Sequence, residues 1–363
     1  MSKKFFKAVL CLILYTILLW ATVTISFATE QAVAEKNIVV DCFGREVEMP
    51  EKIERIGCLF AYAGHAVALL NRGNDIVAIV EGLRRDVLFT EMFPNIKNAL
   101  VPSKSSVINI EELARANCDI LFIQGENAVN EGYVAQIELF NIPYLVVDYN
   151  SIAEHQYSME MIGKAIGQDE EAKQYNEYYN HCIKRVQERI EKIPFSERVT
   201  VYHSVNEATR TDARGTLAAE WLEIAGAHNV SLDADLKFLE NKYFASLEQI
   251  LLWDPEVIIV NEENVDKYIL TNGQWANLQA VKNKRVYKMP NGVSRWGHPT
   301  NAIETPLAIL WTAKLLYPDL FEDINLPEEV KYFYSNFYEW DLSDEYVEKI
   351  LKGEEMRLRK GEV

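Results

Sequence analysis

The sequence is poor in the residues and patterns that build catalytic and metal centres. Its 363 residues include six histidines and five cysteines, and the cysteines are widely spaced without a metal or redox motif. No GxSxG, HExxH, GxGxxG or Walker glycine pattern is present. Lysine and arginine form no large cluster and the formal net charge is −17, which would repel nucleic-acid phosphate. These absences argue against a familiar enzyme and against a nucleic-acid partner.

The N-terminus has the layout of a secretory signal. Three lysines within residues 3–7 precede an apolar run over 8–27, and a small-x-small site follows at Ser26 and Ala28. We therefore expect a signal peptide over 1–28 and an extracytoplasmic protein, in the periplasm or on the outer face of the cell membrane. The run of about twenty residues is also long enough to span a membrane, so an uncleaved anchor is the alternative.

Length and composition indicate two domains of ordinary size. A hydrophobic content of 49% with 11% aromatic residues excludes a disordered chain. Export would permit disulfides, but a chain of this length can form a sufficient core without them. We expect four mostly buried thiols at Cys42, Cys58, Cys118 and Cys182.

One fifteen-residue pattern occurs twice in the chain. It reads NIEELARANCDILFI over 109–123 and SLEQILLWDPEVIIV over 246–260. In each copy a helix-capping residue stands two places before a glutamate, Glu111 or Glu248, and an apolar helical stretch, an acidic break and a run of β-formers follow. Each copy predicts a helix, a turn and a buried strand. One copy in each half predicts two similarly built α/β lobes with a cleft between them.

The patterns around these copies predict the domain plan. A hairpin turning at Phe43-Gly44 and a βαβ pattern place the first lobe over 37–150. Residues 151–194 contain no proline before Pro194, which predicts one long linking helix, with a break at Gly167-Gln168 left open. A second lobe is expected over 195–324 and a tail of two amphipathic helices over 325–363. The predicted fold is α/β, two Rossmann-like lobes joined by a single long helix, and small closure is expected because a helix resists bending.

Several separated motifs together resemble a known family. The DCFGREVEMP hairpin, the NIEEL and SLEQI copies and SRWGHPTNAIETPLAILWTAKLLYPDLF resemble class III, helix-linked substrate-binding proteins of ABC importers, which carry iron-siderophores, haem and cobalamin. The resemblance covers about residues 37–346. It implies a solute receptor without enzymatic activity or cofactor that delivers a small molecule to an ABC permease in the membrane. We expect it to be a monomer.

The resemblance also assigns a role to two glutamates. In cobalamin- and siderophore-type members a glutamate on each lobe docks against permease arginines, and the matching positions here are Glu111 and Glu248. A carboxylate in the first turn of a helix is favoured by the helix dipole and can meet a guanidinium in two parallel hydrogen bonds. The alternative is that each glutamate only caps its own helix.

Loops after the strands supply the candidate ligand-binding residues, because ligands of open α/β sheets lie beyond the carboxyl ends of the strands. The candidates are Tyr62, His65, Arg84, Arg85, His203, Arg210, Arg214, Arg295, Trp296 and His298. Around His203, family members often carry a glycine-rich loop, and YHSVNEATRTDARGT departs from that pattern. The departure weakens any ligand identity taken from the family.

The densest group of candidates lies in the segment 294–298. It follows the expected strand RVYKM and precedes a helix expected to begin near Pro299 or Thr300. The guanidinium, indole and imidazole of Arg295, Trp296 and His298 can clamp an anion, stack on a flat ring or ligate a metal. The alternative is that Arg295 pairs with a nearby acid, such as Glu304, while the two rings pack a domain corner.

Residue chemistry favours a metal-containing solute, with an iron complex such as a siderophore or haem-like chelate as the first choice. Arginines, tyrosines and tryptophans suit a bulky anionic chelate better than a naked cation. A molybdate or tungstate oxyanion, for which Arg295 and helix-start amides suffice, is an alternative, as is a corrinoid. His298 and His203 are the candidate metal ligands. Two other classes stay open: a secreted metal-dependent hydrolase using His203, His298 and Glu263, and a surface interaction module using the tail helices.

Overall fold

The computed structural model describes residues 37–104, 106–299, 302–354 and 356–358. The signal expected over 1–28 lies outside these residues. The chain divides into two compact units, Met1–Ile38 and Val39–Val363, and both large sheets belong to the second unit. Within the described ranges, no helix has the length and apolar character needed to cross a membrane.

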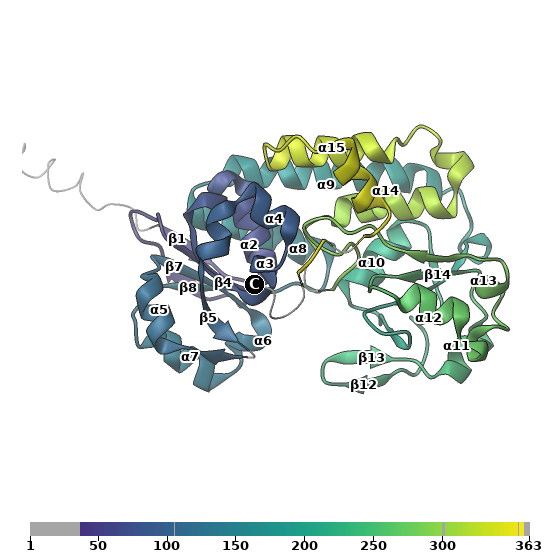
Figure 1. Cartoon of the computed structure of the whole chain (residues 1–363), viewed down its shortest axis with the longest axis horizontal. Helices are drawn as coiled ribbons and strands as arrows, with labels where there is room; N and C mark the ends of the chain where they lie inside the picture. Colours follow the sequence, from purple (N-terminus) through teal and green to yellow (C-terminus); the bar gives the residue numbers. More distant parts are fainter. Residues whose placement is uncertain (1–36, 105, 300–301, 355, 359–363) are drawn as a thin grey trace, which may run out of the picture. The chain divides into compact units, whose positions relative to one another are not determined.

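The first lobe contains a six-stranded sheet in the order β6-β5-β4-β3-β7-β8 (Figure 1). Its strands are β3 (Ile56–Leu59), β4 (Ile76–Val80), β5 (Leu100–Lys104), β6 (Val107–Ile108), β7 (Ile120–Gln124) and β8 (Tyr144–Val147). All neighbours are parallel except β5 and β6. The chain adds strands on one side of β3 and then crosses to β7 on the other side. The switch between β3 and β7 is where α/β sheets place ligands.

The helices of this lobe connect the parallel strands, and the predicted hairpin precedes them. The helices are α2 (Ala61–Val67), α3 (Glu81–Arg84), α4 (Val87–Met92), α5 (Ile110–Ala116), α6 (Gly125–Ala128) and α7 (Glu131–Glu138). Strands β1 (Ile38–Val40) and β2 (Glu46–Glu48) form a separate two-stranded sheet. Gly44 occupies the turn with a φ of 75°, a conformation that glycine adopts without strain. The hairpin predicted around Phe43-Gly44 is therefore present.

The second lobe contains a four-stranded parallel sheet in the order β11-β9-β14-β15. Its strands are β9 (Thr200–Ser204), β11 (His228–Asn229), β14 (Val257–Val260) and β15 (Val286–Lys288). A small antiparallel sheet that the sequence did not predict joins β10 (Arg210–Thr211), β12 (Lys237–Leu239) and β13 (Lys242–Phe244). The helices are α10 (Leu217–Ile224), α11 (Leu247–Trp253), α12 (Val265–Thr271), α13 (Gln279–Lys282) and α14 (Thr305–Leu316). The prediction of two α/β lobes is confirmed.

Helix α14 begins later than the expected start near Pro299 or Thr300. The backbone N–H of Thr305 bonds the carbonyl of Ala302 at 3.0 Å, which forms a turn before the helix. Pro306 then stands in the first turn of α14, where its missing N–H has no helical partner to lose. The start is therefore fixed by the turn and the proline rather than by Pro299.

The segment between the lobes consists of α8 (Ile152–Ile166) and α9 (Asp169–Ile190), with the break at Gly167-Gln168 that the sequence left open. Gly167 ends α8 in the left-handed conformation, with a φ of 72°. Bonds from Gln156 to Asn180 (2.8 Å) and from Asn176 to Glu160 (2.9 Å) hold the two helices together, so the chain reverses between them. The segment is thus a helical hairpin and not the single long helix that the sequence predicted, because Gly167 ends α8 and the chain reverses there.

The tail contains the two expected helices, α15 (Leu326–Phe337) and α16 (Asp344–Leu351). Helix α14 packs against both α9 and α15, and Figure 1 shows the three helices side by side. The rings of Tyr178 in α9 and Phe337 in α15 lie 5.3 Å apart. Aromatic contacts therefore join the linking hairpin to the tail.

Both copies of the repeated sequence pattern form the predicted helix, turn and buried strand. The side chains of Asn109 and Ser246 cap α5 and α11 by accepting the N–H of the third helical residue, each at 3.1 Å. Each helix ends at a left-handed residue, Asn117 with a φ of 45° and Asp254 with a φ of 42°. Strands β7 and β14 follow, and each has a neighbouring strand on both sides.

The acidic residue after each left-handed turn binds the start of the neighbouring parallel strand. Asp119 Oδ2 accepts the backbone N–H groups of Glu54 and Arg55, both at 2.8 Å, directly before β3. Glu256 Oε2 accepts the N–H of Thr200 at 2.9 Å, at the start of β9. The acidic break of the pattern therefore aligns β3 with β7 and β9 with β14.

Replacing Asp119 with alanine should lower the free energy of unfolding by about 1–3 kcal/mol, because two backbone N–H groups lose their acceptor. Asp119→Asn keeps a side-chain oxygen and should lose less. Urea denaturation measures both, with the exposed Asp341→Ala as a control that should stay within about 0.5 kcal/mol of the native protein. Equal stabilities for Asp119→Ala and the control would contradict the alignment role.

Candidate functional site

A cavity of about 500 Å³ lies at the carboxyl ends of the first lobe's strands. Its lining includes Phe60 after β3, Glu81 after β4, Lys104 at the end of β5 and Gln124 at the end of β7. The second lobe contributes the loop 291–295 and His298, and the C-terminal residues Met356 and Arg357 complete the lining. The volume falls within the range of about 300–1,000 Å³ typical of small-molecule sites. The position agrees with the rule for open α/β sheets.

Basic side chains outnumber ionised acids around the cavity. The lining carries four basic groups, Arg85, Lys104, Arg295 and Arg357, and three acidic ones, Glu81, Asp86 and Glu126. Burial raises the pKa of Asp86 to about 8, although a hydrogen bond from the Phe89 N–H and the charge of Arg357 oppose this. Asp86 is therefore protonated at neutral pH. The lining therefore carries more basic than ionised acidic groups, and one of the basic groups, Arg295, is also paired with Glu262 outside the lining.

The buried carboxylate of Glu304 positions the cavity loop of the second lobe. It accepts hydrogen bonds from the Ser294 N–H (2.8 Å), the Ser294 hydroxyl (2.9 Å) and the Tyr334 hydroxyl (2.8 Å). Burial raises the pKa of Glu304 to about 7 despite these bonds. Arg295 does pair with a nearby acid, as the alternative interpretation of the sequence expected, but the acid is Glu262. Glu304, the acid suggested from the sequence, is instead bonded to Ser294 and Tyr334.

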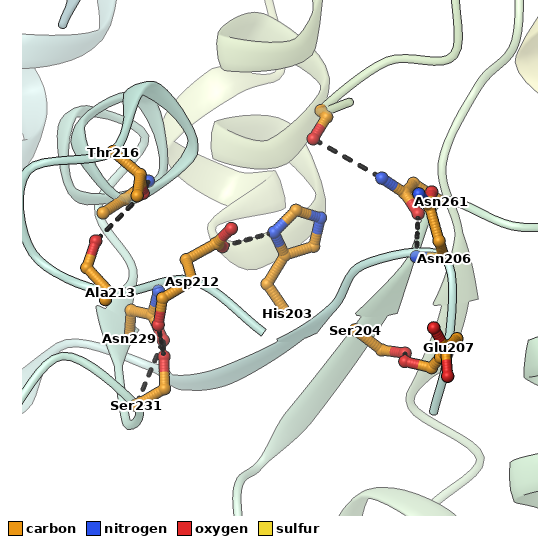
Figure 2. Close-up of polar contacts among 12 residues, drawn as sticks. His203, Ser204, Asn206, Glu207, Asp212, Ala213, Thr216, Asn229, Ser231 and Asn261 are labelled. Atoms are coloured by element: carbon orange, nitrogen blue, oxygen red, sulfur yellow. Dashed lines mark hydrogen bonds and ion pairs between the residues drawn. The ribbon is translucent and has the colours of Figure 1, made fainter. Parts of the chain in front are cut away.

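Two asparagines hold the other end of this loop. The Asn206 N–H donates to the Asn261 side-chain oxygen at 2.8 Å, and Figure 2 shows these residues side by side after strands β9 and β14. The Asn261 amide donates to the Gly297 carbonyl at 3.5 Å, and Asn206 Nδ2 lies 3.4 Å from His298 Nε2. Burial, followed by the positive charges nearby, lowers the pKa of His298 to about 3. His298 therefore presents a neutral imidazole to the cavity.

Of the ligand-binding residues predicted in the first lobe, Arg85 lines the cavity. Tyr62 and His65 are buried, with 0% and 2% of their surface exposed, because their side chains on α2 face the core. Arg84 donates to the Ala99 carbonyl and lines a separate groove. The lining thus gives no support to a binding role for Tyr62, His65 or Arg84.

Of those predicted in the second lobe, Arg295 and His298 line the cavity. The other four lie outside the lining: His203, Arg210, Arg214 and Trp296. His203 is fully buried and its Nδ1 lies 2.6 Å from Asp212, as Figure 2 shows. Trp296 is 1% exposed, and Arg214 forms an exposed ion pair with Asp233 at 2.7 Å. Arg210 is half-buried in β10, which lowers its pKa.

The geometry does not favour a bound bare cation. Among the residues the structure describes, no group of three or more His, Cys, Asp or Glu side chains is placed to hold a metal ion. His203 Nδ1 is engaged with Asp212, and Glu263 forms an ion pair with Lys288. The His203, His298 and Glu263 centre expected of a hydrolase is therefore not assembled.

The four cysteines Cys42, Cys58, Cys118 and Cys182 are free thiols, and all but Cys42 are buried.

Sequence reasoning missed Lys104, Met356 and Arg357. Lys104 ends β5, and the rule that ligands lie beyond strand ends would have found it had β5 been recognised as a strand. Met356 and Arg357 follow the last helix, in a tail whose sequence signals were helical only. No local signal places these two residues at the cavity.

The two predicted docking glutamates occupy equivalent positions on α5 and α11. Glu111 and Glu248 are exposed in the first turns of their helices. The capping bonds are made by Asn109 and Ser246 rather than by the glutamates. Within the described part of the chain, neither carboxylate has a recorded hydrogen bond or ion pair. Their geometry leaves both carboxylates accessible to a partner.

Comparisons with known proteins agree with this architecture. A family model described as periplasmic binding protein matches residues 135–292. The chain is 26% identical over 326 residues to the molybdate-binding protein MolA of Haemophilus influenzae, covering 83% of this chain and 91% of that protein. The structure of MolA bound to molybdate superimposes with a TM-score of 0.74 at 25% identity, covering 84% of this chain and 99% of that one. A solute-binding protein from Veillonella parvula gives a TM-score of 0.73 at 25% identity, with 86% and 96% covered.

The chain is thus similar in sequence and in fold to periplasmic binding proteins of ABC transporters. The family resemblance read from the sequence is therefore confirmed. Proteins of this type bind small solutes and deliver them to an ABC permease, and the relatives are binding proteins rather than enzymes. The cavity of this chain lies at the strand ends of the first lobe, with further lining residues from the second lobe and from Met356 and Arg357.

The raised pKa of Glu304 predicts a pH-dependent stability. Because its folded pKa of about 7 lies above the ordinary value of 4.5, protonation favours the folded state, and this contribution is lost as pH rises from about 4.5 through 7. Glu304→Gln cannot titrate, so it should become more stable relative to the native protein between about pH 5 and 8. Urea denaturation across this range measures the difference, with the exposed Glu322→Gln as control. A difference that does not change with pH would refute the raised pKa.

Proposed function

We propose that the protein is an extracytoplasmic receptor that captures an oxyanion of the molybdate or tungstate class and delivers it to an ABC permease. The observation that carries this proposal is the cationic cavity lining, with Arg85, Lys104, Arg295 and Arg357. Guanidinium groups form charge-assisted, often paired, hydrogen bonds to oxyanions. The MolA relative, which is described as molybdate-binding, supports the same class of ligand.

The lining is less suited to an iron chelate, which the sequence favoured first. The argument for a chelate relied on aromatic residues, yet Tyr62 and Trp296 are buried outside the lining. Among the described lining residues, Phe60 has the one phenyl, phenol or indole ring. A haem or corrinoid presents a large flat surface that normally packs against apolar and aromatic side chains. Haemin and ferric citrate therefore serve as competing ligands in the binding experiment.

Delivery is proposed to use the two equivalent glutamates. Glu111 and Glu248 present carboxylates on α5 and α11, the helices that the repeated sequence pattern forms in each lobe. One acidic residue on each lobe can meet two arginines of a permease. Export by the N-terminal signal would place the receptor on the same side of the membrane as the permease entrance.

Purified protein should bind molybdate or tungstate with one site per chain in isothermal titration calorimetry. Arg295→Ala should weaken binding by about 1.5–3 kcal/mol, or roughly 10- to 150-fold, because a charge-assisted bond is lost. Arg214→Ala removes the same charge outside the cavity and should leave the dissociation constant unchanged. Saturable binding of haemin or ferric citrate without oxyanion binding would refute the proposed ligand. An unchanged constant for Arg295→Ala would remove that residue from the site.

Reversing the charge of both docking glutamates should separate transport from binding. Glu111→Arg with Glu248→Arg should block molybdate uptake by cells that carry the cognate importer, while the dissociation constant changes by less than about threefold. The control combines Glu131→Arg and Glu170→Arg, which alter exposed first-turn glutamates of α7 and α9. Normal uptake by the first pair, or equal loss in the control, would contradict docking through Glu111 and Glu248.

A further inference from the structure

The end of the chain contacts both lobes beside the cavity. We call Gly353, Glu354 and Met356–Leu358 the C-terminal segment. On the second lobe, Asn291 donates its side-chain amide to the Glu354 carbonyl at 3.3 Å, and its backbone N–H bonds the end of α16 at 3.0 Å. On the first lobe, the Val87 N–H donates to the Met356 carbonyl, and the Leu358 N–H donates to the Arg85 carbonyl, both at 2.9 Å.

The C-terminal segment supplies a hydrogen-bond acceptor that the first lobe itself does not provide. Val87 is the first residue of α4, and the first N–H groups of a helix have no acceptor within the helix. The Met356 carbonyl supplies that acceptor. Residues Asp86 and Arg357 pair in an antiparallel bridge, so the segment adds a short strand-like edge to this part of the lobe.

Side chains reinforce the same attachment. Arg85 Nε donates to the Leu358 carbonyl at 2.8 Å, and Arg357 Nη2 donates to the Gly82 carbonyl at 3.0 Å. Arg85 thus binds a carbonyl of the C-terminal segment, Arg357 binds a carbonyl of α3, and both side chains line the cavity. The two guanidinium groups are held in place on one side of the cavity.

A glycine directs the segment away from α16. Gly353 has a φ of 65°, and a Cβ atom there would collide with the Met289 carbonyl oxygen. Glycine is thus required both by the backbone conformation and by the close approach. Met289 directly precedes the cavity loop of the second lobe. The C-terminal segment therefore starts beside this loop and continues to the first lobe.

We propose that the C-terminal segment is a third wall of the anion site and that Arg357 is a ligand-binding residue. This inference rests on the proposed function, because it assumes that the cavity holds an oxyanion. Met356 and Arg357 line the cavity together with Arg85 of the first lobe and Arg295 of the second. A guanidinium already held at the cavity gives up less conformational entropy when an anion binds. The wall also limits the side through which a bound anion can leave.

Two variants test the wall. Arg357→Ala removes the charge alone, and a chain ending at Glu354 removes the contacts to the first lobe while keeping Gly353 and Glu354. We expect Arg357→Ala to weaken molybdate binding about tenfold and the shortened chain to weaken it at least tenfold, with faster dissociation in stopped-flow measurements. Lys352→Ala is the matched control, because it removes one positive charge from the same tail at an exposed pair with Glu348. It should stay within about twofold of the native protein.

Hydrogen exchange supplies a readout that needs no ligand. The amide of Val87 should exchange at least about tenfold faster in the shortened chain, because it loses the Met356 carbonyl. Unchanged exchange would overturn the attachment to the first lobe, and an unchanged molybdate dissociation constant in both variants would overturn the binding role. A native protein that binds neither molybdate nor tungstate would refute the proposed function and Arg357's role in it. The Val87 exchange would still decide whether the segment joins the lobes.

Discussion

The second lobe's side of the cavity depends on the burial of one carboxylate. Glu304 is fully buried, which is unfavourable for an ionised group unless hydrogen bonds compensate. The compensating donors are Ser294 and Tyr334, and the first of these lies in the cavity loop. A side chain at Gly292 would collide with the Glu304 carboxylate, so the close packing depends on glycine there. The same bonds that make the burial tolerable thus fix the loop that carries Arg295.

The two lobes use the same local arrangement of helix, turn and acidic residue to align neighbouring strands. In each, a capped helix ends in a left-handed residue, and the acid that follows, Asp119 or Glu256, binds the start of the neighbouring strand. Strands that start in register also end in register when they are parallel and of similar length. The first lobe's strand ends line the cavity directly. In the second lobe, Asn206 and Asn261 follow the strand ends, and Asn261 binds the Gly297 carbonyl beside the cavity loop.

The features predicted correctly have local signals. Capping residues and runs of β-formers identified α5, β7, α11 and β14, and the strand-end rule found Arg85, Arg295 and His298. Whether a candidate side chain reaches the cavity depends on the direction in which it points. Consecutive helix residues differ by about 100° in direction, so neighbouring positions can face the cavity or the core. Tyr62 and His65 face the core for this reason. Arg357 had no local signal, because its partner Gly82 lies 275 residues away in the sequence.

Local electrostatics explain how a chain with a net charge of −17 can have a cavity lined by several basic side chains. Asp86 is an acidic residue of the lining that pairs with Arg357 in the antiparallel bridge. Burial raises the pKa of Asp86 to about 8, so at neutral pH it caps α4 as a neutral group. The C-terminal segment therefore pairs with the first lobe at Asp86 and adds the guanidinium of Arg357 to the cavity lining.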